Sequence, residues 1–192
     1  IAATLAVVGA LLFSAGAAWA DWDDAGAAYE RGDYATALRE IRPLAEQGYV
    51  GAQSDLGVMY DEGYGVPVYD AEAVKWYRKA AELGNVTAQY TLALMYDNGE
   101  GVLVNDAEAV KWYRKAAVQG HADAQNNLGV MYSTGEGVPV NNVKAYMWWS
   151  LAMEQGYENV ATYLDIIKKQ MTPTQIAKAQ KLAAEWWEEH NN

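Results

Sequence analysis

The sequence contains no cysteine, only two histidines and a single phenylalanine among its 192 residues. Without cysteine the chain has no disulfide, no thiolate nucleophile, no zinc–thiolate centre and no lipid-modified N-terminal cysteine. The two histidines, His121 and His190, leave little material for a catalytic triad or a histidine-based metal site. We therefore expect a fold that is stabilised by packing and that uses no metal and no cofactor.

Positive charge is also scarce, because 14 lysines and arginines face 25 aspartates and glutamates, for a formal net charge of -11. Nucleic acids and anionic lipid surfaces are bound largely through lysine and arginine, so a chain of this charge would be repelled by them. We expect no nucleic-acid partner. The hydrophobic fraction of 52% favours a packed globular domain over disorder.

Residues 1–20 carry no charge and end in Ala18-Trp19-Ala20. This pattern fits the apolar core and the cleavage site of a secretory signal peptide, here clipped at its N-terminus because the usual basic residues are missing. The alternative is a retained single membrane anchor, since about 20 apolar residues can span a bilayer. Cleavage predicts a periplasmic or secreted protein with no stable membrane anchor.

A period of 36 residues runs through the rest of the chain. Glycines recur at this spacing at Gly48, Gly84, Gly120 and Gly156, and the twelve residues DAEAVKWYRKAA occur both at 70–81 and at 106–117. Repetition at a fixed period of this length is typical of solenoids, in which each unit stacks on its neighbours.

Each repeat predicts two helices. Ala52, Leu56 and Met59 lie on one face of the first helix, at the spacing i, i+4, i+7. The duplicated segment predicts the second helix, with Asp70 or Asp106 as its N-cap and with its basic residues pointing outward. Its inward positions are Ala73, Trp76, Tyr77, Ala80 and Ala81. In the first repeat, the turn Gly63-Tyr64-Gly65 followed by Pro67 separates the two helices.

The two ends differ from the middle, as the ends of a repeat array should. We expect one domain over residues 21–192, with about five helix pairs: a leading unit at 21–47, full repeats at 48–83, 84–119 and 120–155, and a C-terminal cap at 156–192. In the cap, Thr172, Pro173 and Gln175 match a helix capping box. No composition shift indicates a linker.

The repeat unit resembles the Sel1-like repeat (SLR) of the tetratricopeptide-like superfamily. The resemblance rests on A-Q-x-x-L-G-x-M-Y-x-x-G-x-G-V and on A-x-x-W-Y-x-K-A-A-x-x-G, which begin at Ala52 and Ala73. The leading unit is closer to an ordinary tetratricopeptide repeat. The resemblance implies an all-α, right-handed solenoid of antiparallel helix pairs that serves as a non-catalytic, protein-binding scaffold. Some exported relatives that are rich in cysteine act on β-lactams, but a chain without cysteine does not inherit that expectation.

Positions that differ between repeats are free to carry specificity. Steps of 100° place such positions opposite the buried face of each first helix, and the resemblance implies that the first helices line a concave groove. Tyr90 is the strongest candidate anchor, because aromatic residues dominate interface energetics. The candidate protein-binding residues are Ser54, Val58, Asp61, Thr87, Tyr90, Leu94, Asp97, Asp123, Asn126, Val130 and Ser133. The alternative is that these side chains simply face water.

Three functional hypotheses follow. The first is a non-catalytic exported scaffold that binds a protein or peptide partner for assembly or regulation at the cell envelope. The alternative is an accessory protein that binds or helps to secrete cell-wall glycan or exopolysaccharide, which the 8 tryptophans and 14 tyrosines would suit by stacking on sugar rings. A hydrolase has the weakest support, because the sequence has neither a nucleophile elbow nor a metalloprotease motif.

Overall fold

The computed structural model describes residues 24–190, and these residues form helices, turns and loops with no strand. The chain divides into two compact units, Ile1–Asn85 and Val86–Asn192. The predicted signal segment, residues 1–20, lies outside the described residues. The expectation of one domain over residues 21–192 stays a prediction.

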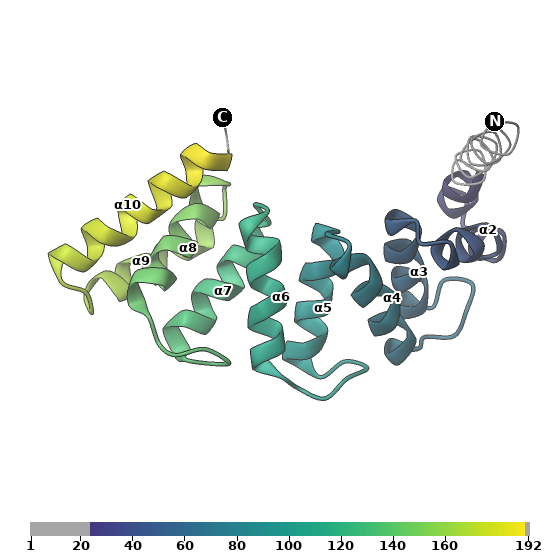
Figure 1. Ribbon diagram of the computed structural model, residues 1–192, viewed down its shortest axis with the longest axis horizontal. Coiled ribbons are helices and arrows are strands. Elements are labelled where there is room, and N and C mark those ends of the chain that lie inside the picture. The colour runs from purple at the N-terminus through teal and green to yellow at the C-terminus, as the bar shows by residue number, and fades with distance from the viewer. Residues whose placement is uncertain (1–23, 191–192) are drawn as a thin grey trace, which may run out of the picture. The chain divides into compact units, whose positions relative to one another are not determined.

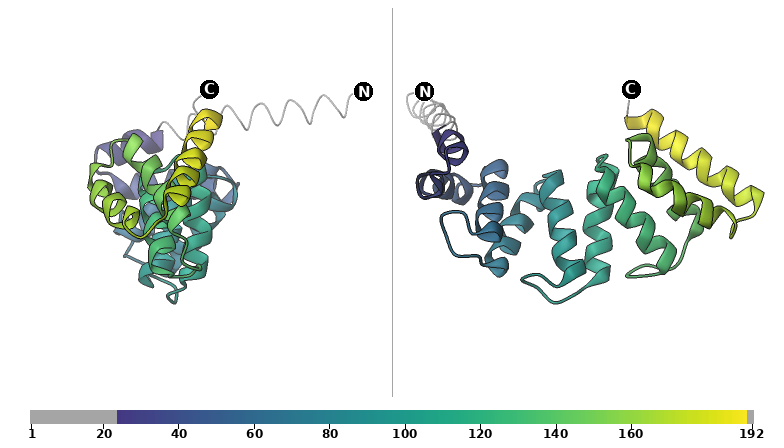
Figure 2. Two further views of the ribbon diagram at one scale, coloured as in Figure 1. Left: turned by 90° about the vertical axis from the view of Figure 1, so that its left-hand side faces the viewer. Right: turned by 180° about the vertical axis from the view of Figure 1, so that it is seen from behind.

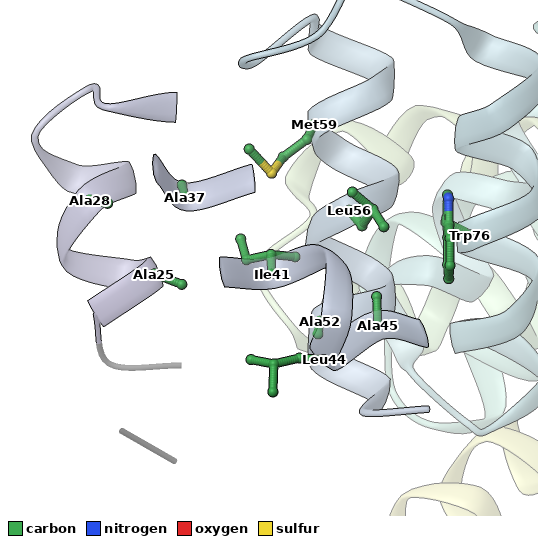
Figure 3. Packing of buried hydrophobic residues seen from close by; sticks show 10 residues of the cluster. All are labelled: Ala25, Ala28, Ala37, Ile41, Leu44, Ala45, Ala52, Leu56, Met59 and Trp76. Carbon is green, nitrogen blue, oxygen red and sulfur yellow. The ribbon is translucent and has the colours of Figure 1, made fainter. Parts of the chain in front are cut away.

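The first unit contains a helical stretch at residues 24–30, followed by α2 (Tyr34–Glu46), α3 (Val50–Glu62) and α4 (Asp70–Glu82). Helix α3 packs against both α2 and α4 (Figure 1). Figure 3 shows Ala25 and Ala28 on one side of α2 and the α3 side chains on its other side. The buried cluster consists of Ala25, Ala28, Ala37, Ile41, Leu44, Ala45, Ala52, Leu56, Met59 and Trp76.

The second unit contains α5 (Val86–Asn98), α6 (Asp106–Val118), α7 (Ala122–Thr134) and α8 (Asn142–Glu154). The 3-10 helix η1 (Glu158–Val160), α9 (Ala161–Lys168) and α10 (Pro173–His190) follow. Each helix from α5 to α8 packs against the next, and α10 packs along α8. The loops after α5 and α7 emerge at the same end of their helix pairs (Figure 2).

The duplicated segment forms α4 and α6, as predicted. All five predicted inward positions are buried in both copies: Ala73, Trp76, Tyr77, Ala80, Ala81, Ala109, Trp112, Tyr113, Ala116 and Ala117. Lys75 and Lys79 are exposed, and the Lys79 ammonium lies 3.7 Å from the centre of the Trp76 ring. The basic and aromatic residues of this segment therefore lie on different faces of the helix, and the aromatic residues are part of the core.

The N-caps of these helices lie one residue earlier than the sequence predicted. Helix α6 begins at Asp106, and the side chain of Asn105 accepts a hydrogen bond from the Glu108 amide at 3.1 Å. Tyr69 holds the same place before α4 and makes no such bond. The prediction of Asp70 and Asp106 as caps was wrong, because the non-helical backbone of residues 69 and 105 is where the chain enters each helix.

The capping box at the start of α10 is confirmed. The Thr172 amide donates to Gln175 Oε1 at 2.8 Å, and the Gln175 amide donates back to Thr172 Oγ1 at 3.3 Å. These reciprocal bonds satisfy two amides that a helix start leaves without intrahelical partners.

The two glycines of the Gly-x-Gly turns at 63–65 and 135–137 have different roles. Gly63 ends α3 in the left-handed conformation, with φ of 74°. A Cβ on Gly65 would lie 2.5 Å from the Tyr34 carbonyl oxygen, and one on Gly137 would clash with the Asp106 carbonyl. The second glycine therefore lets the loop lie directly on the start of the preceding repeat's second helix.

Buried glutamines connect successive helix pairs. Gln125 donates from Nε2 to the Ala117 carbonyl at 3.1 Å and accepts at Oε1 from Gln155 at 2.8 Å. Gln53 makes the first kind of bond, to the Ala45 carbonyl at 3.2 Å, but its Oε1 has no hydrogen-bond partner among the described residues. Gln53 lacks this partner because its own repeat has Leu83 at the position that Gln119 and Gln155 occupy in the next two repeats.

Candidate functional site

The first helices of the repeats, α3, α5 and α7, are called the A helices, and the second helices α4, α6 and α8 are called the B helices. The alanine, leucine and methionine that recur in every A helix are buried: Ala52, Leu56, Met59, Ala88, Leu92, Met95, Ala124, Leu128 and Met131. The recurring tyrosine is buried at Tyr96 and Tyr132 and half-buried at Tyr60. The prediction that these constant positions face the core is confirmed. A partner that binds an A helix must therefore contact its remaining residues.

One row of accessible positions runs along each A helix, at the spacing i, i+4, i+7, i+11. We call it the A stripe: Gly51, Asp55, Val58 and Glu62 on α3; Thr87, Thr91, Leu94 and Asn98 on α5; Asp123, Asn127, Val130 and Thr134 on α7. Each of these residues is exposed or half-buried. Five of the predicted binding residues belong to it: Val58, Thr87, Leu94, Asp123 and Val130.

Ser54 does not belong to this surface, because only 8% of it is exposed. The prediction placed the open side of the helix opposite Ala52, Leu56 and Met59, as though only one face were covered. Helix α3 contacts a helix on each side, α2 and α4, so Gln53 and Ser54 are buried as well. The centre of the accessible row therefore shifts to Asp55.

Asp61 and Asp97 bind a tyrosine of their own repeat. The hydroxyl of Tyr77 donates to Asp61 at 3.3 Å, and that of Tyr113 donates to Asp97 at 3.1 Å. Burial raises the pKa of both tyrosines, and the adjacent carboxylates raise it further. Burial also raises the pKa of the Asp97 carboxyl, although the hydrogen bond from Tyr113 opposes that shift. These two hydrogen bonds link α3 to α4 and α5 to α6.

The third repeat replaces this pair. Ser133 stands where the earlier repeats have aspartate, and its hydroxyl donates to the Val130 carbonyl at 2.8 Å. Trp149 stands where they have tyrosine, and its indole nitrogen donates to the Asn126 carbonyl at 3.2 Å. Asn126 also donates from its side chain to Asn127 Oδ1 at 3.1 Å. Ser133 and Asn126 are both half-buried.

Tyr90 is half-buried, and its ring stacks on the imidazole of His121, with 4.4 Å between the ring centres. His121 caps α7 by accepting a hydrogen bond from the Ala124 amide at 3.4 Å. Burial raises the pKa of the Tyr90 hydroxyl, with further contributions from Asp123 and Tyr157. Burial lowers the pKa of His121 and outweighs the opposing effect of Asp123. Tyr90 on α5 therefore packs against His121, the N-cap residue of α7.

Charge is divided between the two helix types. The A helices carry Asp55, Asp61, Glu62, Asp97 and Asp123 and no lysine or arginine. Every basic residue between positions 50 and 154 lies on a B helix, apart from the single histidine at 121: Lys75, Arg78, Lys79, Lys111, Arg114, Lys115 and Lys144. Each A stripe is thus negative or neutral.

A small cavity opens beside the A stripe of the first unit. It has a volume of about 300 Å³ and is lined by Ala25, Gly26, Tyr29, Glu30, Ile41, Asp55 and Val58. Burial of the Asp55 carboxyl by the surrounding protein raises its pKa, although Asp55 as a whole is exposed to solvent. We call this cavity the Asp55 cup.

The sequence prediction did not include the A-stripe residues Asp55, Glu62, Thr91, Asn98, Asn127 and Thr134. A signal for this row was present, because the position of Asp55 changes to threonine and then to asparagine in the next repeats, whereas its neighbour Gln53 is glutamine in all three. Treating Gln53 as a core residue would have moved the predicted row by one position. The cup also needs residues 25–30, whose distance from α3 no periodicity reveals.

Across residues 24–190, no group of three or more histidine, aspartate or glutamate side chains is arranged to hold a metal ion. The same residues include no helix with the length and apolarity needed to cross a membrane.

The helix pairs define a repeat scaffold of the tetratricopeptide-like class. The Sel1 repeat model matches residues 50–85, 86–121 and 122–157, each starting two residues after the boundary predicted from the glycine spacing. The chain therefore belongs to the Sel1 repeat family, as the sequence resemblance indicated, and the predicted all-α helix-pair solenoid is confirmed. Repeats of this family commonly mediate protein–protein interactions and are typically non-catalytic.

Two solved structures are similar to this chain. A Sel1 repeat protein from Oxalobacter formigenes shares 35% sequence identity with a TM-score of 0.71, over 76% of this chain and 60% of its own length. The protein c5321, a protective antigen present in uropathogenic Escherichia coli strains that displays an SLR fold, shares 33% identity with a TM-score of 0.70. That match covers 81% of this chain but only 33% of c5321. No curated protein matches the chain.

Proposed function

We propose that this protein is an exported, non-catalytic scaffold that binds a protein or peptide partner through its A stripes, for assembly or regulation at the cell envelope. The observation that carries the proposal is the contrast along each A helix. The alanine, glutamine, leucine and methionine positions that recur in all three repeats are buried, whereas stripe residues such as Asp55, Thr91 and Asn127 differ and are accessible. Variation at accessible positions is expected where a surface is fitted to a partner.

The composition of each stripe supports this proposal. Val58, Leu94 and Val130 lie at equivalent, half-buried positions near the middle, with more polar residues around them. An apolar centre with a polar rim is the usual anatomy of a protein interface. A partner that covers these side chains gains their remaining apolar area without the protein having to rearrange.

The proposal of export is supported by the sequence of residues 1–20. An uncharged apolar segment that ends in Ala18-Trp19-Ala20 is the pattern that signal peptidase cleaves, and Asp21 would begin the mature chain. N-terminal sequencing of protein recovered from the periplasm or the medium tests this part. Recovery of the protein in the cytosol with residues 1–20 intact would contradict it.

A second candidate function, glycan binding, is favoured by one observation. In the second unit Trp149 stacks on Tyr163 with 5.2 Å between ring centres, and Tyr163 is 45% exposed. Aromatic faces of this kind suit sugar rings. Retention on cell-wall glycan or exopolysaccharide that is lost in Tyr163→Ala, with no polypeptide partner found, would favour this function over the first.

Site-specific photo-cross-linking tests the proposed function. We would replace Thr91, on the A stripe of α5, or Lys111, exposed on the B helix α6, with p-benzoylphenylalanine and irradiate living cells. The expected result is a discrete polypeptide adduct from position 91 and none from position 111. Adducts only from position 111, or equally from both, would contradict binding through the A stripe.

A further inference from the structure

The Asp55 cup in the first unit combines an apolar floor with a charged rim. Ala25 and Ile41, which line it, are 2% and 4% exposed, and Val58 adds a third apolar side chain. Asp55 and Glu30 contribute two exposed carboxylates, and no lining residue is basic. Its volume of about 300 Å³ lies at the lower limit for small-ligand sites. The cup is therefore sized for one long side chain.

The carboxylates of the cup have no cationic partner within the described residues. Neither the Asp55 nor the Glu30 side chain forms a hydrogen bond or an ion pair with a described residue. Among the arginines of the first unit, Arg39 pairs with Glu40 at 2.7 Å, Arg42 donates to the Tyr60 hydroxyl at 3.3 Å, and Arg31, next to Glu30 in the sequence, forms no ion pair with a described residue. A cation that enters the cup would therefore meet negative charge that the protein itself does not neutralise.

Tyr29 adds an aromatic wall to the same cavity. Burial raises the pKa of its hydroxyl, and the other contributions come from Tyr64, Tyr34, Asp55 and Glu62. The ring is held in place by Tyr34 and Tyr64, whose centres lie 5.3 Å and 5.6 Å from it. A tyrosine face fixed beside carboxylates favours a cation, through the ring quadrupole as well as through charge.

From this geometry we propose that the Asp55 cup binds the side chain of a lysine or arginine from the partner polypeptide. The aliphatic stem packs on Ala25, Ile41 and Val58, while the charged head lies between Asp55 and Glu30. Lysine and arginine have the required shape, because they bury an apolar stem and keep a charged end in water. This inference rests on the proposed function and specifies it: the partner segment facing the first unit is basic.

A larger cavity in the second unit does not carry the same inference. It has a volume of about 580 Å³ between α8, α9 and α10, and its lining includes Lys168 together with Glu154 and Asp165. Mixed charge of this kind selects neither cations nor anions. The Asp55 cup has charge of one sign only.

A titration followed by NMR tests the inference. The probes are three capped nonapeptides, (Gly-Ser-Lys)₃, (Gly-Ser-Glu)₃ and a norleucine version that keeps the stem without the charge. They are added to the full chain, labelled at its amides and methyl groups. We expect the lysine peptide to shift the Gly26 amide and the Ile41 and Val58 methyls, and we expect the other two peptides to leave those signals unchanged.

Two variants with the same change in net charge provide the control. Asp55→Asn should weaken binding of the lysine peptide by about fivefold, as the loss of one partly exposed ion pair. Glu82→Gln, at the exposed end of α4, should leave the affinity within about twofold. Melting curves must show that both variants fold like the parent chain.

Several outcomes would overturn the inference. These are absence of shifts with the lysine peptide, equal binding of the norleucine peptide, or equal losses in both variants. Shifts of the same signals on raising the protein concentration without peptide would assign the cup to a second copy of the chain. Cross-linking from position 91 is independent of Asp55. Adducts there without lysine-peptide binding would refute this inference alone, and peptide binding without adducts would refute the proposed function alone.

Discussion

At the scale of single residues, Leu83 lacks a hydrogen bond that the two following repeats make. The equivalent positions before and after it are Gln47, Gln119 and Gln155. Gln119 and Gln155 donate to the buried glutamine of their own repeat at 2.7 Å and 2.8 Å. Leu83 cannot donate, so Gln53 keeps an unpaired buried oxygen and the leucine is 59% exposed.

Leu83→Gln should therefore stabilise the protein, by about 0.5 to 1.5 kcal/mol, the usual net value of an intramolecular hydrogen bond. The matched control is Gln155→Leu, which removes the donor to Gln125 and should cost about 1 to 3 kcal/mol. Urea unfolding followed by circular dichroism measures both changes. A loss of stability in Leu83→Gln would show that Gln53 does not need this partner.

His121 gives a second prediction at this scale. Its folded-state pKa lies below the unfolded value because of burial, so the unfolded chain binds the proton more readily. The stability that depends on neutral His121 is complete above the unfolded pKa of about 6.5 and is lost as the pH falls through the folded value. Protonation also removes the Nδ1 acceptor that caps α7.

The test compares the parent chain with His121→Asn, because Asn85 holds the equivalent position one repeat earlier. Between pH 7.5 and pH 5.5 the free energy of unfolding should fall more steeply for the parent chain than for the variant. Parallel pH profiles would show that His121 does not titrate with a lowered pKa.

At the scale of elements, the helices were predictable because their sequence periods are strong and occur more than once. The spacing of alanine, tryptophan and tyrosine in the duplicated segment is sufficient to assign it to a helix and to identify its inward face. The orientation of the A helices was harder to predict, because Ser54 is buried by packing on both sides of α3. The periodicity of one helix shows its most apolar face, not how much of its circumference its neighbours cover.

The B-helix caps give a prediction at this scale. Asn105 and Asn141 each accept a hydrogen bond from a backbone amide three residues later, at 3.1 Å and 3.0 Å, whereas Tyr69 at the equivalent position cannot. Tyr69→Asn should stabilise the protein by about 1 kcal/mol, the typical value of an N-cap. Asn105→Tyr should cost a similar amount. Thermal unfolding of the two variants measures this, and equal effects of the same sign would contradict the account.

At the scale of the whole molecule, the sequence contains two sets of residues: those that recur and form the repeats, and those that differ from one repeat to the next. The fold could be predicted because buried residues recur with the period of 36, and the family match agrees. The Asp55 cup could not be predicted in this way, because its lining comes from residues 25–30, Ile41 and α3, which no single repeat contains. Its partner is defined only by complementary chemistry, and the absence of lysine and arginine from the A helices favours a basic polypeptide.

The central claim is that the A stripe binds a polypeptide while the recurring residues hold the fold. The most direct test is the affinity, by calorimetry, of the partner recovered by cross-linking from position 91. Leu94→Lys changes an apolar residue of the A stripe, and Val118→Lys makes the same change at a residue of the B helix α6 that is 43% exposed. We predict a loss of about thirtyfold or more for Leu94→Lys, the size of an interface hot spot, and a change within about twofold for Val118→Lys. Unchanged affinity in Leu94→Lys, or an equal loss in both variants, would contradict the claim.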